Sequence, residues 1–176
     1  MAASPFQALL DAARDRNLPP VEQWNPARVG EIDIRIAANG DWYHEGEPIK
    51  RFAIARVFST ILRLDEGQHF LVTPGEKLRI HVDDAPFLAI DMETEGKGRA
   101  RRILFTTNMG DVVPVDANHP IRVEERDGQP RPYVEVRHGL RALIARSVFY
   151  RLVDLADEEA SGEFSVWSDG TRFVLG

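Results

Sequence analysis

The sequence predicts an α+β protein in which a strand-strand-helix-strand-strand module is present twice and the strands form antiparallel sheets. The first observation is a helical pattern over residues 51–64, where apolar residues cover more than half of the cylinder. The polar residues of this segment recur at helical spacing: Arg56, Ser59, Thr60 and Arg63. A helix so apolar is expected to be packed on most of its sides. The second observation is a predicted hairpin directly after it, with strands at 70–73 and 78–82 around the turn Pro74-Gly75.

The third observation is an internal repeat. Arg51-Phe-Ala-Ile-Ala-Arg56 aligns with Arg141-Ala-Leu-Ile-Ala-Arg146, which lies about ninety residues further along the chain. A hairpin is predicted before each helix, over residues 31–43 in the first copy and 121–137 in the second. The second helix is predicted over residues 140–156. Chance similarity between two amphipathic helices is the alternative explanation, but the matching hairpins favour duplication.

The remaining elements follow in chain order. Ser4 and Pro5 suit the N-cap and first position of a helix that ends near Arg16, because Leu18-Pro19-Pro20 cannot continue it. Trp24 lies in the connector that follows, either as a buried anchor or as a surface on which a ligand stacks. Strand patterns are predicted over residues 31–36, 88–95, 101–107 and 111–115, with a last hairpin at 163–175.

A chain of 176 residues accommodates one larger domain or two small ones, and the duplication favours two. We expect an N-terminal helix and linker over residues 1–23, a first module over 24–88 and a second module over 89–176.

The composition narrows the classes of function. Apolar residues make up 43% and charged residues 28%, as in an ordinary soluble globular protein. No apolar run approaches 18 residues and no signal-peptide pattern is present, so we expect a cytoplasmic protein without a membrane partner. The absence of cysteine excludes disulfides, thiolate zinc sites and thiol nucleophiles. A net charge of −6 argues against a nucleic-acid partner, although a local basic pocket for a small anion remains compatible with it.

The sequence lacks the common catalytic motifs. It contains no nucleophile elbow, no zinc-protease helix motif and no complete phosphate-binding loop, and it indicates no particular cofactor. The five histidines have no spacing that brings two onto one helical face, so we expect no metal site. Asp83 and Asp84 are consecutive and point to opposite sides of an extended chain, which favours turn carboxylates over a catalytic pair.

Basic residues stand where helices disfavour them. The first predicted helix begins with Lys50-Arg51, and the second carries Arg141 in its first turn, although helix N-termini favour acidic residues. An anion bound by the free amides and these guanidinium groups would remove the conflict. The alternative is that the side chains extend into solvent or pair with nearby acids.

Two further arginines lie within apolar helical segments. Arg56 and Arg146 should each need a partner, and Asp33 and Asp84 are candidates for Arg56. A duplicated structural ion pair explains this pattern as well as a ligand does.

Motifs along the chain resemble a bacterial family catalogued as domain of unknown function 1285. The motifs that carry the resemblance are Gly30-Glu-Ile-Asp33-Ile, Gly40-Asp-Trp42-Tyr43, Pro48-Ile49-Lys-Arg51, Arg56-Val-Phe58-Ser59, Ile61-Leu62-Arg63, Leu71-Val-Thr73-Pro74-Gly-Glu76-Lys77, Val82-Asp-Asp84-Ala-Pro86-Phe87, Phe105-Thr-Thr107-Asn108-Met-Gly110-Asp111 and Val166-Trp167-Ser168-Asp169-Gly170. The resemblance implies a duplicated α+β core whose second copy is similar to a pleckstrin-homology domain. It also implies a nucleotide-like ligand between the modules and a role in signal transduction.

These observations favour a non-enzymatic regulatory protein that binds a small phosphate-bearing, nucleotide-like ligand in the groove between its two modules and acts with a signalling partner. The predicted ligand-binding residues are Arg51, Arg56, Lys77, Arg141, Arg146, Asp84, and Trp24 or Trp42 as a stacking surface. One alternative is a protein-interaction adaptor that pairs an open sheet edge with an extended peptide. A second is a hydrolase with a novel site, for which Asp33, Asp84 and His81 would be the acids and bases.

Overall fold

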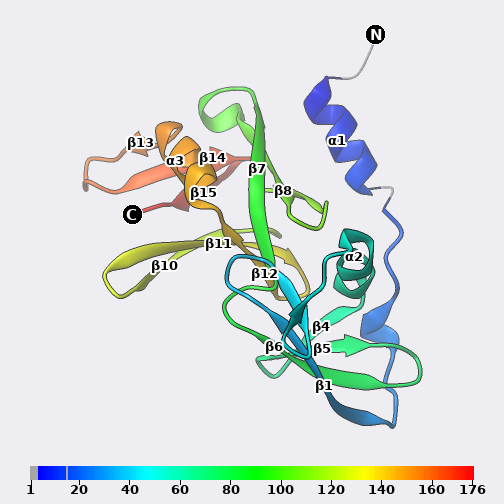
Figure 1. Cartoon of the computed structure of the whole chain (residues 1–176). Helices are drawn as coiled ribbons and strands as arrows, with labels where there is room; N and C mark the ends of the chain where they lie inside the picture. Colours follow the sequence, from blue (N-terminus) through cyan, green and yellow to red (C-terminus); the bar gives the residue numbers. More distant parts are fainter. Residues whose placement is uncertain (1–3, 15) are drawn as a thin grey trace. The chain divides into compact units, whose positions relative to one another are not determined.

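A computed structural model describes residues 4–14 and 16–176 of the chain (Figure 1). The chain forms two compact units. The N-terminal unit comprises residues 17–86 together with 138–140. The C-terminal unit comprises the described residues up to Arg16, together with 87–137 and 141–176. The helix at the start of the chain therefore belongs with the second half of the sequence.

The N-terminal unit is built on a six-stranded sheet with the order β3-β2-β1-β6-β5-β4. Strand β1 is parallel to β6, and the other neighbours are antiparallel. The elements in chain order are η1 (Val21–Gln23), β1 (Val29–Ile36), β2 (Trp42–His44), β3 (Glu47–Pro48), α2 (Phe52–Thr60), β4 (Leu62–Asp65), β5 (Gln68–Val72) and β6 (Lys77–Val82).

The C-terminal unit contains a second six-stranded sheet, with the order β10-β11-β12-β7-β8-β9, and a three-stranded sheet, β13-β14-β15. Its elements are α1 (Pro5–Arg14), β7 (Phe87–Glu95), η2 (Gly98–Ala100), β8 (Arg102–Thr107), β9 (Val112–Pro114), β10 (Ile121–Arg126), β11 (Gln129–Arg137), β12 (Leu140–Ile144), α3 (Arg146–Asp154), β13 (Asp157–Glu158), β14 (Phe164–Ser168) and β15 (Thr171–Val174). Leu140 is the one residue of the six-stranded sheet that clusters with the N-terminal unit.

The two six-stranded sheets have the same topology. Each contains two sets of three consecutive strands, and the first strand of the first set is parallel to the last strand of the second. The helices differ in position: α2 connects the two sets, whereas α3 follows the second set. The similarity between the halves therefore lies in the sheets, and the sequence alignment of the two helical segments pairs elements that are not equivalent.

The helix predicted over residues 51–64 is too long. It ends at Thr60, and Leu62–Asp65 forms the edge strand β4, paired with β5. Apolar composition alone did not distinguish the end of α2 from strand β4, because both segments are partly buried. The strand is favoured because Leu62 is buried and the neighbouring Arg63 finds fixed partners.

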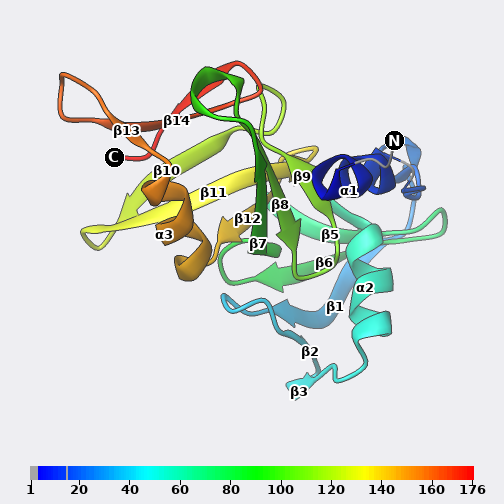
Figure 2. The ribbon, with the colours of Figure 1, turned by 90° about the horizontal axis from the view of Figure 1, so that it is seen from above.

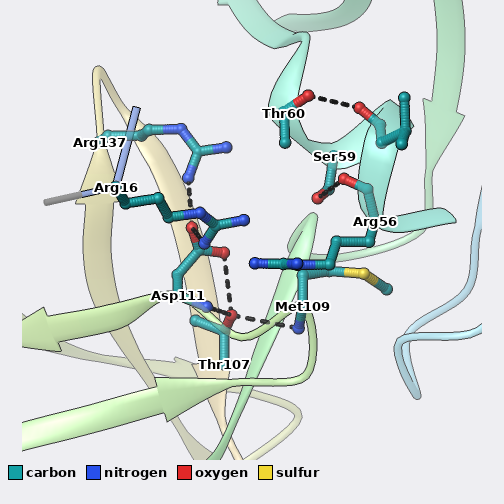
Figure 3. A network of polar contacts seen from close by, with 9 residues as sticks. Arg16, Arg56, Ser59, Thr60, Thr107, Met109, Asp111 and Arg137 are labelled. Atoms are coloured by element: carbon teal, nitrogen blue, oxygen red, sulfur yellow. Dashed lines mark hydrogen bonds and ion pairs between the residues drawn. The ribbon is translucent and has the colours of Figure 1, made fainter. Parts of the chain in front are cut away.

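The packing predicted for α2 is also wrong. Its buried residues are Ala55 and Ser59, while Phe52 and Val57 are 55% and 62% exposed. Ser59 tolerates burial because its hydroxyl donates to the Arg56 carbonyl at 2.6 Å. Thr60 donates in the same way to the Val57 carbonyl (Figure 3). The predicted polar stripe is therefore not a purely solvated face, because the hydroxyl groups of Ser59 and Thr60 are satisfied within the helix.

The second predicted helix, over residues 140–156, is wrong in its first five residues. Leu140–Ile144 is strand β12, and α3 begins at Arg146. Leu140, Ala142 and Ile144 are buried in alternation, which is a strand period, and β12 pairs in parallel with β7. A local helical pattern in the sequence contains no information about pairing with a distant strand.

The predicted hairpins and the N-terminal helix are confirmed. The Ser4 side chain accepts a hydrogen bond from the Gln7 amide at 3.1 Å, as an N-cap should. Phe6 and Leu10 of α1 then pack on Leu104 of β8, next to Val112 of β9. Figure 2 shows α1 lying beside β9. Within the described residues, no helix is long and apolar enough to cross a membrane.

Candidate functional site

The candidate site is a cavity of about 640 Å³ in the C-terminal unit, between the β10–β11 hairpin and the start of α3. This volume is within the range of cavities that hold small organic molecules. Its lining comes from three places: Leu88 on β7, residues 126, 127 and 129–132 of the hairpin, and residues 143–146, 149 and 150 of β12 and α3. Figure 1 shows α3 next to the β10–β11 hairpin.

One wall of the cavity is the N-terminus of α3. Ala145 occupies the N-cap position, and no side chain of the described residues caps the helix there. The Ala145 amide donates to the Ala89 carbonyl, and the first bond inside the helix runs from the Phe149 amide to the Ala145 carbonyl at 2.8 Å. The amides between them point along the helix axis and carry its partial positive charge. Arg146, the first helical residue, is exposed and adds a full positive charge at the same place.

The opposite wall is the end of the β10–β11 hairpin. The turn Asp127-Gly128 has positive φ angles of 53° and 73°, which suit a two-residue hairpin turn. Arg126 pairs in register with Gln129, and Arg131 pairs with Glu124. Arg126 and Arg131 both line the cavity, and Asp127 is the one carboxylate among its described lining residues. Three arginines and one aspartate therefore line this cavity, in a chain of net charge −6.

Aromatic and apolar groups complete the lining. Tyr150 is 60% exposed and Phe149 is half-buried. Pro130, Pro132 and Leu143 contribute further apolar surface. Such groups can contact the flat or apolar part of an organic ligand, while the arginines bind an anionic part.

Of the sequence-predicted ligand-binding residues, Arg146 lines this cavity and the others lie elsewhere. Arg141 pairs with Glu124 at 2.7 Å and lies over the Tyr133 ring at 4.0 Å. Lys77, in the N-terminal unit, pairs with Asp65 at 2.6 Å and lies over the ring of Phe70. Both cations are therefore engaged by residues of their own unit.

The other predicted residues belong to the N-terminal unit. Arg51 and Arg56 are exposed at the start and in the middle of α2, and Asp84 is half-buried after β6. Trp24 is half-buried, and its carbonyl accepts a hydrogen bond from Arg63 at 2.6 Å. Trp42 is 2% exposed and stacks on Phe58, with 6.3 Å between ring centroids. The Trp42 ring is thus enclosed by side chains of the core.

Sequence reasoning missed the cluster around Asp65. Arg63 is 6% exposed, binds the Asp65 carboxylate at 2.9 Å and donates to the Val21 carbonyl at 2.8 Å. Burial opposes ionisation of Asp65, but hydrogen bonds from Lys77 and Arg63 outweigh it and hold the pKa of Asp65 below its ordinary value. The spacing Arg63-x-Asp65 on a strand was the available signal, because residues two apart share a face.

A second missed cluster surrounds Asp111 in the C-terminal unit. Asp111 is 5% exposed and contacts both Arg16, which follows α1, and Arg137, at the end of β11 (Figure 3). Its other carboxylate oxygen accepts from the Thr107 hydroxyl at 3.0 Å, and that hydroxyl accepts from the Met109 amide. This cluster fixes the β8–β9 turn to two distant segments of the unit.

A second cavity, of about 610 Å³, lies in the N-terminal unit where the pairing register of β1 and β6 shifts between Glu31 and Arg35. Asp33 and His81, two of the three residues expected in a hydrolase, line it, and Asp84 does not. His81 pairs with Asp83 at 3.0 Å, and a hydrogen bond from Arg35 holds the pKa of Asp83 below its ordinary value. Among the residues that the structure describes, no group of three potential ligands is placed to hold a metal ion.

Comparison with known families matches both parts of the chain. Residues 19–85 match the domain of unknown function DUF1285, N-terminal domain, and residues 86–175 match the C-terminal domain of the same protein of unknown function. No curated protein matches the chain.

Two solved structures are similar to this chain. The crystal structure of a DUF1285 family protein from Silicibacter pomeroyi DSS-3 is 46% identical, with a TM-score of 0.87, and the match covers 99% of this chain and 96% of that one. A DUF1285 family protein from Shewanella baltica OS155 is 28% identical, with a TM-score of 0.57, over 70% of this chain and 92% of that one.

Proposed function

The chain belongs to the DUF1285 family of unknown function, and from that premise we propose that it is a non-enzymatic binding protein for a small phosphate-bearing ligand. The proposed site is the cavity between the β10–β11 hairpin and α3 in the C-terminal unit. The observation that carries the proposal is the convergence of Arg126, Arg131 and Arg146 on one cavity that also contains the uncapped start of α3.

The chemistry of phosphate recognition supports this choice. A guanidinium group donates hydrogen bonds in pairs to phosphate oxygens, and helix N-termini offer amide donors with a partial positive charge. Without a ligand, Arg146 lies at the end of the helix where its charge is unfavourable by tenths of a kcal/mol to about 1 kcal/mol. A bound phosphate group would offset this cost, because its negative charge interacts favourably with both Arg146 and the start of the helix.

The composition of the lining favours binding over catalysis. Among the described lining residues, the groups with ordinary acid–base chemistry are Asp127 and Tyr150, and both are on exposed positions. No nucleophile–base pair is present within this set. We therefore propose a regulatory role, in bacterial signal transduction, in which the ligand acts as the signal. We also propose that the C-terminal unit is related to pleckstrin-homology domains, since α3 follows its six-stranded sheet.

Thermal unfolding of the purified full chain tests this function. The panel consists of mononucleotides, cyclic dinucleotides, guanosine tetraphosphate and inorganic phosphate. A ligand at about one hundred times its Kd adds about 2.7 kcal/mol of apparent stability. We expect at least one phosphate-bearing compound to raise the melting temperature of the wild-type protein, and Arg146→Gln to abolish most of that rise.

Arg122→Gln is the matched control, because Arg122 is an exposed arginine of β10 that does not line the cavity. It should leave the ligand-induced rise unchanged. Equal losses in both variants would indicate general attraction by charge, and no response to any compound would contradict the proposed function.

A further inference from the structure

We propose that the outer face of α2, in the N-terminal unit, is a docking surface for an acidic amphipathic helix of a partner protein. This outer face consists of Ala53, Ile54 and Val57, with Lys50 and Arg51 at its N-terminal end. It shares no residue with the proposed phosphate-binding cavity, which lies in the C-terminal unit.

The outer face is apolar where a surface helix is ordinarily polar. The helix buries Ala55 and Ser59. Because successive residues of an α-helix are about 100° apart, Ala53 and Val57 lie on the opposite side, and Ile54 lies next to Val57. Val57 is 62% exposed and Ile54 is 40% exposed. Large apolar side chains gathered on one exposed helix face are typical of a surface that another molecule covers.

The charges beside this face are positive. Lys50 and Arg51 precede the first turn of α2, both are exposed, and neither side chain forms an ion pair with a residue that the structure describes. The sequence contains no acidic residue from Pro48 to Leu64, and no side chain among the described residues caps the start of the helix. The partial positive charge of the helix start adds to the two cations. Acidic residues of a partner would therefore meet uncompensated positive charge next to an apolar surface.

The shape of the face favours a helix as the partner. Ala53 and Val57 are four residues apart and form a ridge of the kind that packs into the groove of a second helix. The small side chain of Ala53 allows the two backbones to approach closely. An extended peptide would find no sheet edge here, because the backbone groups of a helix bond within the helix.

The same charges argue against a second copy of this chain as the partner. The nine residues of α2 span only about 13.5 Å. An interface of that length between two α2 helices would hold Lys50 and Arg51 of both copies without a counter-charge from either helix. A helix with apolar residues flanked by aspartate or glutamate fits the face without this repulsion.

Selection from a phage-displayed peptide library tests the docking surface on the full chain. The peptides are about sixteen residues long, because shorter isolated helices are only marginally stable, and one face of an alanine-rich helix is randomised. We expect the wild-type protein to enrich peptides with apolar residues at helical spacing, flanked by aspartate or glutamate. A synthetic copy of the most enriched peptide should bind with a micromolar Kd, as suits a small interface.

Variants of the full chain assign this binding to α2. Val57→Glu should weaken binding of the peptide about tenfold or more, because it places an anion in the apolar face. Val29→Glu is the matched control, since Val29, on β1 of the same unit, is also 62% exposed, and it should leave the affinity unchanged. Lys50→Glu combined with Arg51→Glu should weaken binding about tenfold at low ionic strength and much less at high ionic strength. Far-ultraviolet circular dichroism of each variant confirms that the fold is retained.

Several results would overturn the proposal. Enrichment of the same peptides on wild type and on Val57→Glu, or equal losses of affinity in Val57→Glu and Val29→Glu, would show that α2 is not the docking surface. Enriched peptides without an excess of acidic residues, or an affinity that charge reversal leaves unchanged, would refute an acidic partner.

Vesicles of phosphatidylcholine and phosphatidylserine form the second arm of the experiment. If the library yields no enriched peptide, the partner helix is refuted, and vesicle binding by wild type but not by Val57→Glu would then assign the face to an anionic membrane surface. None of these results affects the proposed phosphate-binding function, because its site lies in the C-terminal unit.

Discussion

Arg63 is the residue whose role differs most from its sequence pattern. On a helix it would lie on a polar stripe facing solvent; on β4 it is buried and joins Asp65 to the carbonyls of Val21 and Trp24. Its guanidinium therefore holds the connector of residues 21–24 against the edge strand. A planar group with several donors suits this task, because it satisfies a carboxylate and two carbonyl oxygens together.

Replacement of Arg63 by methionine should destabilise the N-terminal unit by about 3–5 kcal/mol. The change leaves the two carbonyl oxygens and part of the Asp65 charge without their donor in a buried place. Urea denaturation measures the loss. Arg79→Met is the control, because Arg79 pairs with Glu31 while 44% of its side chain is exposed, and such pairs are worth about 1 kcal/mol or less. Similar losses in both variants would refute the structural role assigned to Arg63.

Among the elements, α1 shows how a local signal and a distant contact combine. The Ser4 cap and the spacing of Phe6 and Leu10 were sufficient to predict the helix from the sequence. Its partner was not predictable, because Leu104 and Val112 lie nearly a hundred residues away and no local pattern identifies them. The C-terminal end of α2 and the start of α3 were missed for the same reason, since β4 and β12 are strands through pairing with β5 and β7.

Truncation of Leu10 to alanine should destabilise the C-terminal unit by about 2–5 kcal/mol. Leu10 is 2% exposed in the cluster with Phe6 and Leu104, so its removal leaves a cavity as well as a loss of apolar contact. Guanidinium denaturation followed by circular dichroism measures the change. Ala8→Ser, at an exposed position of the same helix, should cost only a few tenths of a kcal/mol. A Leu10→Ala protein as stable as the wild type would show that α1 is not part of the core.

At the scale of the whole molecule, the sequence established the family, the α+β class, most strands and one residue of the candidate site. Arg146 was predicted because a charged side chain inside an apolar helical segment should need a partner, whereas the structure places it at the start of α3. Arg126 and Arg131 were not, because they reach the cavity through the register of a hairpin and the position of a helix twenty residues later. Residues that meet at a cavity from distant segments can be identified only from the three-dimensional structure.

Paired carboxylates in both units give the molecule a defined response to acid. Hydrogen bonds from arginine, lysine, serine or backbone groups hold the pKa values of Asp65, Asp83, Asp91 and Glu159 below their ordinary range. A carboxyl group whose pKa is lower in the folded state contributes stability above its unfolded pKa, and that contribution is lost as the pH falls through the folded value. The free energy of unfolding should therefore be nearly constant from about pH 7 to 5 and should decrease below about pH 4.

Urea denaturation at a series of pH values measures this dependence. Asp65→Asn should lower stability at pH 7 and make the decrease in acid shallower, because the variant has one fewer carboxylate to protonate. If the free energy of unfolding of Asp65→Asn decreases with falling pH as steeply as that of the wild type, Asp65 does not contribute to the acid response.

The most direct test of the binding site is a ¹H–¹⁵N correlation spectrum of the labelled full chain during titration with pyrophosphate. Binding in the cavity predicts concerted shifts of the amides of the lining residues: Arg126, Asp127, Gln129 and Arg131 on one wall, and Ala145, Arg146, Phe149 and Tyr150 on the other. The amides at the start of α3 should move most, because they would donate directly to a phosphate. Shifts confined to other residues, or a spectrum that does not change at millimolar pyrophosphate, would contradict the account of this protein as a phosphate-binding regulator.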